Sequence, residues 1–70
     1  MQIKLKINGK TTAVDPLNAQ DLRSLVAHLR YSGKRIAIER NGEIVPRSQY
    51  ALTPLCEGDV LEIVVAVGGG

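Results

Sequence analysis

A single amphipathic stripe lies between two β-hairpin signals in this sequence, and this arrangement limits the fold more than any other feature. The hairpin signals are Asn8-Gly9 and Asn41-Gly42, whose residues tolerate the positive φ angles of a type I′ turn. Because one helix can cover one face of one sheet, the pattern predicts a two-layer α+β domain. The stripe has the helical spacing i, i+3, i+4 and i+7, and it consists of Leu22, Leu25, Val26 and Leu29.

The N-terminal segment has the pattern of a half-buried strand. Ile3, Leu5 and Ile7 alternate with polar residues, and this period of two is typical of a strand with one face toward the core. A return strand is expected over residues 10–14, and the asparagines of both hairpin signals are interpreted as turn residues only. The two-residue turn predicts a register that places Ile7 opposite Lys10, Leu5 opposite Thr12, and Ile3 opposite Val14.

Polar residues mark the expected ends of the helix. Asn18 is the predicted N-cap, because its side-chain oxygen can accept a hydrogen bond from an unpaired amide of the first turn. Asp21 then falls within the first turn, where a negative charge is favourable. Gly33 is the predicted C-cap, and Arg30 suits the C-terminal end of the helix.

A second hairpin follows the helix. From Arg35 onward, Ile36 and Ile38 alternate with other residues, which again indicates a strand. After the Asn-Gly turn, residues 43–45 are expected to form a short return strand that Pro46 ends.

The last strand is expected to be central in the sheet. Residues 47–55 are interpreted as irregular, and the hydrophobic segment 60–67 as the final strand. Parallel pairing of this strand with the first one, through a connection that contains the helix, gives the β-grasp (ubiquitin-like) arrangement. The prediction is therefore a mixed sheet of four to five strands packed on one helix. The domain spans residues 1–67, and residues 68–70 form a flexible glycine tail.

The size and charge of the chain disfavour several functions. Seventy residues bury only about 60% of their unfolded surface, which leaves little room for a self-contained active site. The net charge is +2, and the basic residues are scattered without interleaved aromatic residues. Nucleic-acid binding is therefore not expected. A carrier or binding module is a better interpretation than an enzyme.

The sequence offers little for metal, disulfide or membrane chemistry. Cys56 is the single cysteine, so an internal disulfide and a multi-cysteine zinc site are excluded. Cys56 is expected to be a partly buried small residue rather than a reactive thiol, and His28 a solvated helix residue rather than a base or ligand. The longest apolar run, residues 63–67, is far shorter than the roughly 20 residues of a membrane span. With no signal peptide apparent, a cytoplasmic location is expected.

The chemical feature of the chain is its end, Gly68-Gly69-Gly70. Glycine loses more conformational freedom on ordering than any other residue, so a mobile tail is expected. Without Cβ atoms, this tail can enter a channel little wider than a peptide backbone. Both properties suit a substrate arm for another protein's active site, although glycine-rich ends are common and are usually no more than frayed termini.

Three segments of the sequence resemble the thiamine-pathway sulfur carrier family (ThiS). Residues 41–47, Asn-Gly-Glu-Ile-Val-Pro-Arg, are similar to the family's N-G-x-x-V-P-R stretch. Residues 57–64 resemble its D/E-G-D-x-(I/L)-E-(I/L)-(V/F) stretch, and residues 66–70 its typical ending. The resemblance covers essentially the whole chain, and the combination of these motifs is more specific than the terminal glycines alone.

The resemblance implies a carrier chemistry. The Gly70 carboxylate is adenylated and then converted to a thiocarboxylate, which donates sulfur to the thiazole ring of thiamine. The implied partners are an E1-like adenylating enzyme (ThiF-like), a thiazole synthase (ThiG-like) and a sulfur-relay protein such as a cysteine desulfurase. ATP and magnesium belong to the adenylating enzyme, so the chain itself binds no cofactor or metal. Free, it is expected to be a monomer.

A docking surface follows from the alternation of the final strand. If Leu61, Ile63, Val65 and Val67 face the helix, the open face of the sheet displays Val64 and Ala66. Lys4 and Lys6 of the neighbouring strand are expected beside them, as the charged rim of a transient partner site. Scattered surface valines are equally compatible with an ordinary solvated face. Arg47 is a further candidate, which either contacts the partner or caps a loop carbonyl.

Three other functions compete with this interpretation. A carrier for molybdopterin, tRNA thiolation or cysteine synthesis has the same tail and the same chemistry. A ubiquitin-like protein modifier would join Gly70 to a lysine through an isopeptide bond. A plain interaction domain would carry the glycines as an inert tail.

Overall fold

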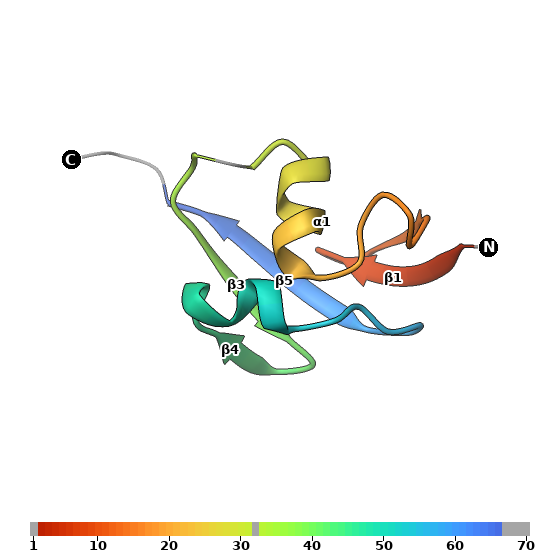
Figure 1. The fold of residues 1–70 in the computed structure, drawn as a ribbon. Helices are drawn as coiled ribbons and strands as arrows, with labels where there is room; N and C mark the ends of the chain where they lie inside the picture. Colours follow the sequence, from red (N-terminus) through yellow and green to blue (C-terminus); the bar gives the residue numbers. More distant parts are fainter. Residues whose placement is uncertain (1, 32, 67–70) are drawn as a thin grey trace.

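The computed structural model describes residues 2–31 and 33–66 and shows one sheet with one α-helix across it (Figure 1). None of the helices in this part of the chain is long and apolar enough to cross a membrane. The elements in chain order are β1 (Ile3–Ile7), β2 (Lys10–Val14), α1 (Leu22–His28), β3 (Ile36–Arg40), β4 (Glu43–Val45), the 3-10 helix η1 (Arg47–Leu52) and β5 (Val60–Val65).

The sheet has the strand order β2-β1-β5-β3-β4, which confirms the predicted central position of the last strand. β1 and β5 are parallel, and the other neighbouring pairs are antiparallel. The crossover from the first hairpin to the rest of the sheet contains α1, which lies on one face (Figure 1). This is the five-stranded mixed sheet of a β-grasp fold, as expected.

The register of the first hairpin agrees with the prediction at every pair. Asn8 and Gly9 have φ angles of 50° and 84°, and Asn41 and Gly42 have 52° and 89°. Positive φ at both central residues is the requirement of a type I′ turn, which matches the twist of the flanking strands. The observed pairs are Ile3 with Val14, Leu5 with Thr12, and Ile7 with Lys10.

The helix begins later than predicted, so the assignment of Asn18 as its N-cap is wrong. Asp21 is the cap, because its Oδ1 accepts hydrogen bonds from the Ser24 amide at 2.8 Å and the Ser24 hydroxyl at 2.9 Å. The backbone amide of Asn18 instead donates to the Asp15 carbonyl at 2.8 Å. Residues 15–18 therefore form a separate turn that precedes the helix.

The helix also ends earlier than predicted, and Gly33 is not its cap. Arg30 adopts the left-handed conformation with φ of 65°, directly after the C-cap Leu29. Its amide donates to the Ala27 carbonyl at 3.1 Å, and the Tyr31 amide donates to the Val26 carbonyl at 2.9 Å. This pair of hydrogen bonds is the Schellman motif, here with arginine at the position that glycine usually takes.

The core lies between α1 and the sheet. In β5 the side chains alternate as predicted over Val60–Ala66, with Leu61 fully buried and Val64 largely exposed. The expectation for Val67 lies outside the described residues. The buried hydrophobic set is Leu5, Ile7, Val14, Ala19, Leu22, Leu25, Val26, Ile38, Tyr50, Leu61 and Ile63.

A buried carboxylate joins the second hairpin to the start of β5. The Asp59 side chain accepts hydrogen bonds from Arg40 Nε at 3.0 Å, Asn41 Nδ2 at 3.2 Å and the Cys56 amide at 2.9 Å. Burial raises the pKa of Asp59, but these hydrogen bonds outweigh it and hold the pKa below its ordinary value. Cys56 itself is exposed, contrary to the expectation of partial burial.

Candidate functional site

The last strand delivers the chain end at one side of the sheet. Val65 pairs with Ile36 of β3, and the Ala66 amide donates to the Arg35 carbonyl at 2.8 Å. Gly68, Gly69 and Gly70, the predicted reactive tail, lie outside the described residues and stay a prediction. Fully extended, the four residues after Ala66 would span at most about 14 Å. A protein that uses the Gly70 carboxylate must therefore contact the domain close to this edge.

The sheet face opposite α1, which we call the open face, carries apolar side chains near this edge. Val64 is 61% exposed and pairs with the exposed Ala37 of β3. Ala66 is also exposed. Ile44 on β4 is 65% exposed on the same face; its direct partner on β3 is Glu39, so it lies diagonally from Ala37. The sequence reasoning missed Ala37 and Ile44, since they join this face only through the pairing of β3 with β5.

The predicted neighbourhood of the two lysines is wrong in register. Lys4 and Lys6 are exposed and β1 does lie beside β5, but Lys6 pairs with Val60. Val64 is four residues farther along β5, or about 13 Å at the rise of a strand. The lysines therefore flank the opposite end of β5 from Val64 and Ala66.

Two carboxylates separate the apolar ends of the open face. Glu62 lies between Val60 and Val64 on β5, and it pairs directly with Glu39 of β3. Both glutamates are exposed. Glu39 also pairs with Ile44 on its other side. The open face thus presents an acidic row next to an apolar patch of Ala37, Ile44, Val64 and Ala66, which we call the open-face patch.

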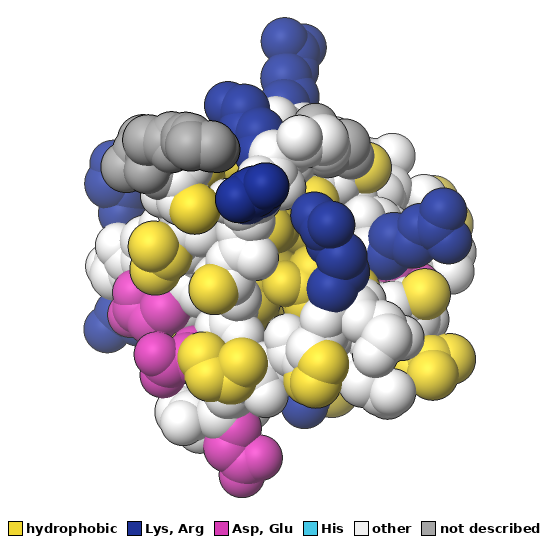
Figure 2. All heavy atoms as spheres, turned by 90° about the vertical axis from the view of Figure 1, so that its left-hand side faces the viewer, with side chains coloured by type: hydrophobic (Ala, Val, Ile, Leu, Met, Phe, Trp, Pro, Cys, Tyr) yellow, Lys and Arg dark blue, Asp and Glu magenta, His cyan; other side chains and the backbone are white. Residues whose placement is uncertain are grey.

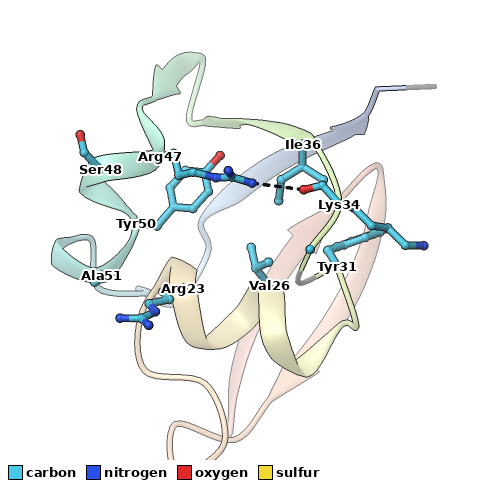
Figure 3. Close-up of a pocket in the computed structure, with 10 residues that line it drawn as sticks. Arg23, Val26, Tyr31, Lys34, Ile36, Arg47, Ser48, Tyr50 and Ala51 are labelled. Atoms are coloured by element: carbon cyan, nitrogen blue, oxygen red, sulfur yellow. Dashed lines mark hydrogen bonds between the residues drawn. The ribbon is translucent and has the colours of Figure 1, made fainter. Parts of the chain in front are cut away.

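Arg47 does not belong to the open face. It lies at the start of η1, and its Nη2 donates to the Lys34 carbonyl at 3.2 Å (Figure 3). Of the two roles left open for this side chain, the structure shows the contact with a loop carbonyl. The five predicted docking residues therefore fall on three places: Val64 and Ala66, Lys4 and Lys6, and Arg47.

Within residues 2–31 and 33–66, no three His, Cys, Asp or Glu side chains gather as a possible metal site. His28 is the last residue of α1 and is exposed, as predicted. The exposed Val64 and Ala66 lie where β5 ends, next to the point at which the described part of the chain stops.

Known proteins with the same pattern were found by sequence and by structure. The profile of the ThiS family matches residues 5–70. The sulfur carrier protein ThiS of Bacillus subtilis is 36% identical over 66 residues, which cover 94% of this chain and 98% of that protein. The crystal structure of a thiamine biosynthesis protein (ThiS) from Geobacter metallireducens superposes with a TM-score of 0.80 at 29% identity, and the match covers 97% of this chain and 100% of that one.

Longer relatives also match. A thiazole synthase of Paramagnetospirillum magneticum is 40% identical over 68 residues. The match covers 97% of this chain, yet the chain spans only 20% of the length of that protein. A thiazole synthase of Magnetococcus marinus is 34% identical, and the match again covers 97% of this chain and 20% of that protein.

Proposed function

The chain belongs to the ThiS family, the sulfur carriers of thiamine biosynthesis. From this premise we propose that the carboxyl group of Gly70 carries the sulfur atom. ThiS proteins are co-substrates and not enzymes. The observation that carries the proposal is the reach of the family match, which extends through residue 70 and so includes the three terminal glycines.

The proposed chemistry begins with activation of a poor electrophile. An α-carboxyl group titrates near pH 3.5, so at neutral pH the Gly70 carboxylate is ionised and is a nucleophile. Its oxygen attacks the α-phosphorus of ATP, pyrophosphate leaves, and an acyl-adenylate forms. ATP and magnesium are held by the adenylating enzyme, which also supplies the groups that stabilise the transition state.

Sulfur then replaces the adenylate. The terminal sulfur of a persulfide on a relay protein, such as a cysteine desulfurase, attacks the Gly70 carbonyl carbon, and AMP leaves. A thiol reduces the resulting acyl disulfide with two electrons and becomes part of a disulfide itself, which leaves a thiocarboxylate on Gly70. The ATP-dependent step and the thiol chemistry both suit the cytoplasmic location expected from the sequence.

The domain's share of this chemistry is presentation. We assign the open-face patch as the surface that docks on the adenylating enzyme, since it is apolar, exposed and next to the edge where the chain end leaves β5. With at most about 14 Å from Ala66 to Gly70, docking far from this edge of the sheet would leave Gly70 short of the active site.

A thiazole synthase is the proposed acceptor of the sulfur. Two relatives carry that name and contain a segment like this chain within a much longer protein. A carrier-like segment in the same polypeptide as a synthase would raise the effective concentration of one for the other. This supports the proposal that the separate carrier delivers its thiocarboxylate to a ThiG-like enzyme.

Intact-mass measurement tests the proposed function. The chain is incubated with ATP, magnesium, a ThiF-like adenylating enzyme, a cysteine desulfurase and cysteine. The expected product is heavier by the mass difference between sulfur and oxygen, and fragmentation places the change on Gly70. An unchanged mass in a reaction that thiocarboxylates the Bacillus subtilis carrier would reject the proposal. A chain shortened by Gly69 and Gly70 is the matched control and should stay unmodified.

A further inference from the structure

A pocket of about 360 Å³ lies on the helix side of the sheet, apart from the open face. Its walls come from α1, the segment before β3, and η1 (Figure 3). Its lining includes Val26 and Ile36, and also Tyr50, which is only 6% exposed. The floor is therefore apolar and already packed into the core, so it needs no rearrangement to accept an apolar group.

Among the described residues that line this pocket, three are cations, namely Arg23, Lys34 and Arg47, and none is a carboxylate. All three are exposed. In the described part of the chain, the one ion pair within 4.0 Å joins Arg40 to Asp59, so no described carboxylate neutralises these cations at short range. The pKa of Asp21 is held below its ordinary value mainly by hydrogen bonds from Ser24, and the backbone amide and the charge of Arg23 add smaller contributions. Figure 2, which faces this side of the molecule, shows Lys and Arg side chains around a hollow with hydrophobic atoms inside it.

The pocket lies close to the base of the tail. Ile36 lines the pocket and is the direct partner of Val65, the last residue of β5. The preceding residue, Arg35, holds the Ala66 amide through its carbonyl. The pocket and the end of β5 are thus one strand apart, because Ile36 belongs to the first and pairs with the second. A partner that docks at this end of β5 is therefore close to the pocket as well.

From this placement we propose that the pocket binds an acidic segment of the adenylating enzyme that carries one apolar side chain. This rests on the proposed function, which supplies the partner. The apolar side chain enters between Val26, Ile36 and Tyr50, and the flanking carboxylates meet Arg23, Lys34 and Arg47 at the rim. The cations come from three separate elements, which suits carboxylates spread along a segment of chain better than one compact anion. Charge complementarity of this kind selects the partner and speeds its association.

The pocket can be tested without the partner. The probe is a short capped peptide, Glu-Asp-Leu-Asp-Glu, titrated into the isotope-labelled chain, with Gln-Asn-Leu-Asn-Gln as its neutral match. We expect saturable shifts of the Ile36, Arg47 and Tyr50 amides with a dissociation constant on the order of 1 mM. Lys34→Glu should weaken this binding at least about fivefold, whereas Lys10→Glu, the same charge reversal on β2, should change it less than about twofold. Equal binding of the neutral peptide, or shifts confined to the open face, would overturn the proposal.

The partner is tested by the Michaelis constant of the carrier in ATP-pyrophosphate exchange with the adenylating enzyme. Lys34→Glu should raise this constant about fivefold with an unchanged turnover number, and added salt should shrink the difference. If the wild-type chain is adenylated and the Michaelis constants of Lys34→Glu and Lys10→Glu are the same, the pocket proposal is wrong and the proposed function stands. If an active enzyme does not adenylate the wild-type chain, the proposed function fails and this partner fails with it.

Discussion

The side-chain amide of Asn8 pairs with the backbone of Ile63 in both directions. Asn8 Oδ1 accepts from the Ile63 amide at 2.7 Å, and Asn8 Nδ2 donates to the Ile63 carbonyl at 3.1 Å. The backbone amide of Asn8 already donates to the Leu61 carbonyl at 2.9 Å. A turn residue thus extends the β1–β5 ladder beyond the end of β1. The interpretation of both turn asparagines as turn residues only is wrong, because Asn41 Oδ1 likewise accepts from the Val60 amide at 2.9 Å.

Asn8→Gly should destabilise the domain although the turn itself tolerates it. Glycine adopts the positive φ of this position at no steric cost, so the change removes the two side-chain hydrogen bonds and adds the larger entropy loss of glycine on folding. We expect the free energy of unfolding to fall by about 1–3 kcal/mol, because both polar groups of the Ile63 backbone lose a partner. Urea denaturation measures this loss. Thr11→Ala on the same hairpin is the control, and an effect of Asn8→Gly no larger than the control's would contradict the assigned role.

Local turn chemistry made the hairpins predictable, and this is why the first hairpin agreed with its predicted register throughout. An Asn-Gly pair with a two-residue loop leaves one register, and the alternation of Ile3, Leu5 and Ile7 leaves one choice of buried face. The central position of β5 was predictable from its sequence, because a strand with neighbouring strands on both edges tolerates more apolar residues than an edge strand.

Contacts between distant segments were not predictable in the same way. Asn18 and Asp21 are both residue types that suit an N-cap. The helix starts after Asp21 because the Leu22 amide donates a hydrogen bond to the distant Thr53 carbonyl at 3.0 Å. The parallel pair of β1 and β5 has no turn to set its register, so the position of Lys6 relative to Val64 could not be derived. The same applies to the pocket, whose walls meet only in the folded chain.

Arg30→Gly should stabilise the protein. A residue with a Cβ in the left-handed conformation costs roughly 1 kcal/mol, and glycine avoids this cost at the C′ position of a Schellman motif. We expect a gain of at most about 1 kcal/mol in the free energy of unfolding, because glycine also loses more entropy on folding. Arg30→Ala removes the same side chain but keeps the strain, so it should show no gain. A gain shared equally by both variants would assign the effect to the side chain instead.

Asp59 should make the stability of the fold depend on acid. Its folded-state pKa lies below the ordinary 3.8, so the unfolded chain takes up the proton first as the pH falls. Its contribution is therefore complete near neutral pH and is lost progressively below about pH 5. Asp59→Asn should lower the free energy of unfolding by about 1–3 kcal/mol at pH 7, and the gap from wild type should narrow toward pH 3. Denaturation curves between pH 3 and pH 7 measure this difference in the free energy of unfolding. A difference that does not change with pH would contradict the role assigned to the Asp59 charge.

Glu39→Gln should raise stability slightly. Glu39 and Glu62 are directly opposite on neighbouring antiparallel strands, where like charges repel. Relief of this repulsion should add several tenths of a kcal/mol to the free energy of unfolding at low ionic strength, and 1 M salt should remove most of the gain. Thermal denaturation at both salt concentrations measures it. A gain of the same size at high salt would point to a cause other than charge.

Val64→Asp should weaken adenylation of the chain without unfolding it. Val64 is 61% exposed, so a carboxylate there remains solvated in the free domain, but docking would bury it against an apolar surface. We expect the Michaelis constant of the carrier in pyrophosphate exchange to rise about tenfold, which corresponds to about 1.4 kcal/mol of docking energy. Leu17→Asp is the matched control, because Leu17 is 85% exposed in the turn before α1 and lies outside the open-face patch. Circular dichroism should report both variants as folded. If Val64→Asp and Leu17→Asp have the same Michaelis constant, the open-face patch is not the docking surface. The partner must then reach Gly70 from another side of the sheet edge.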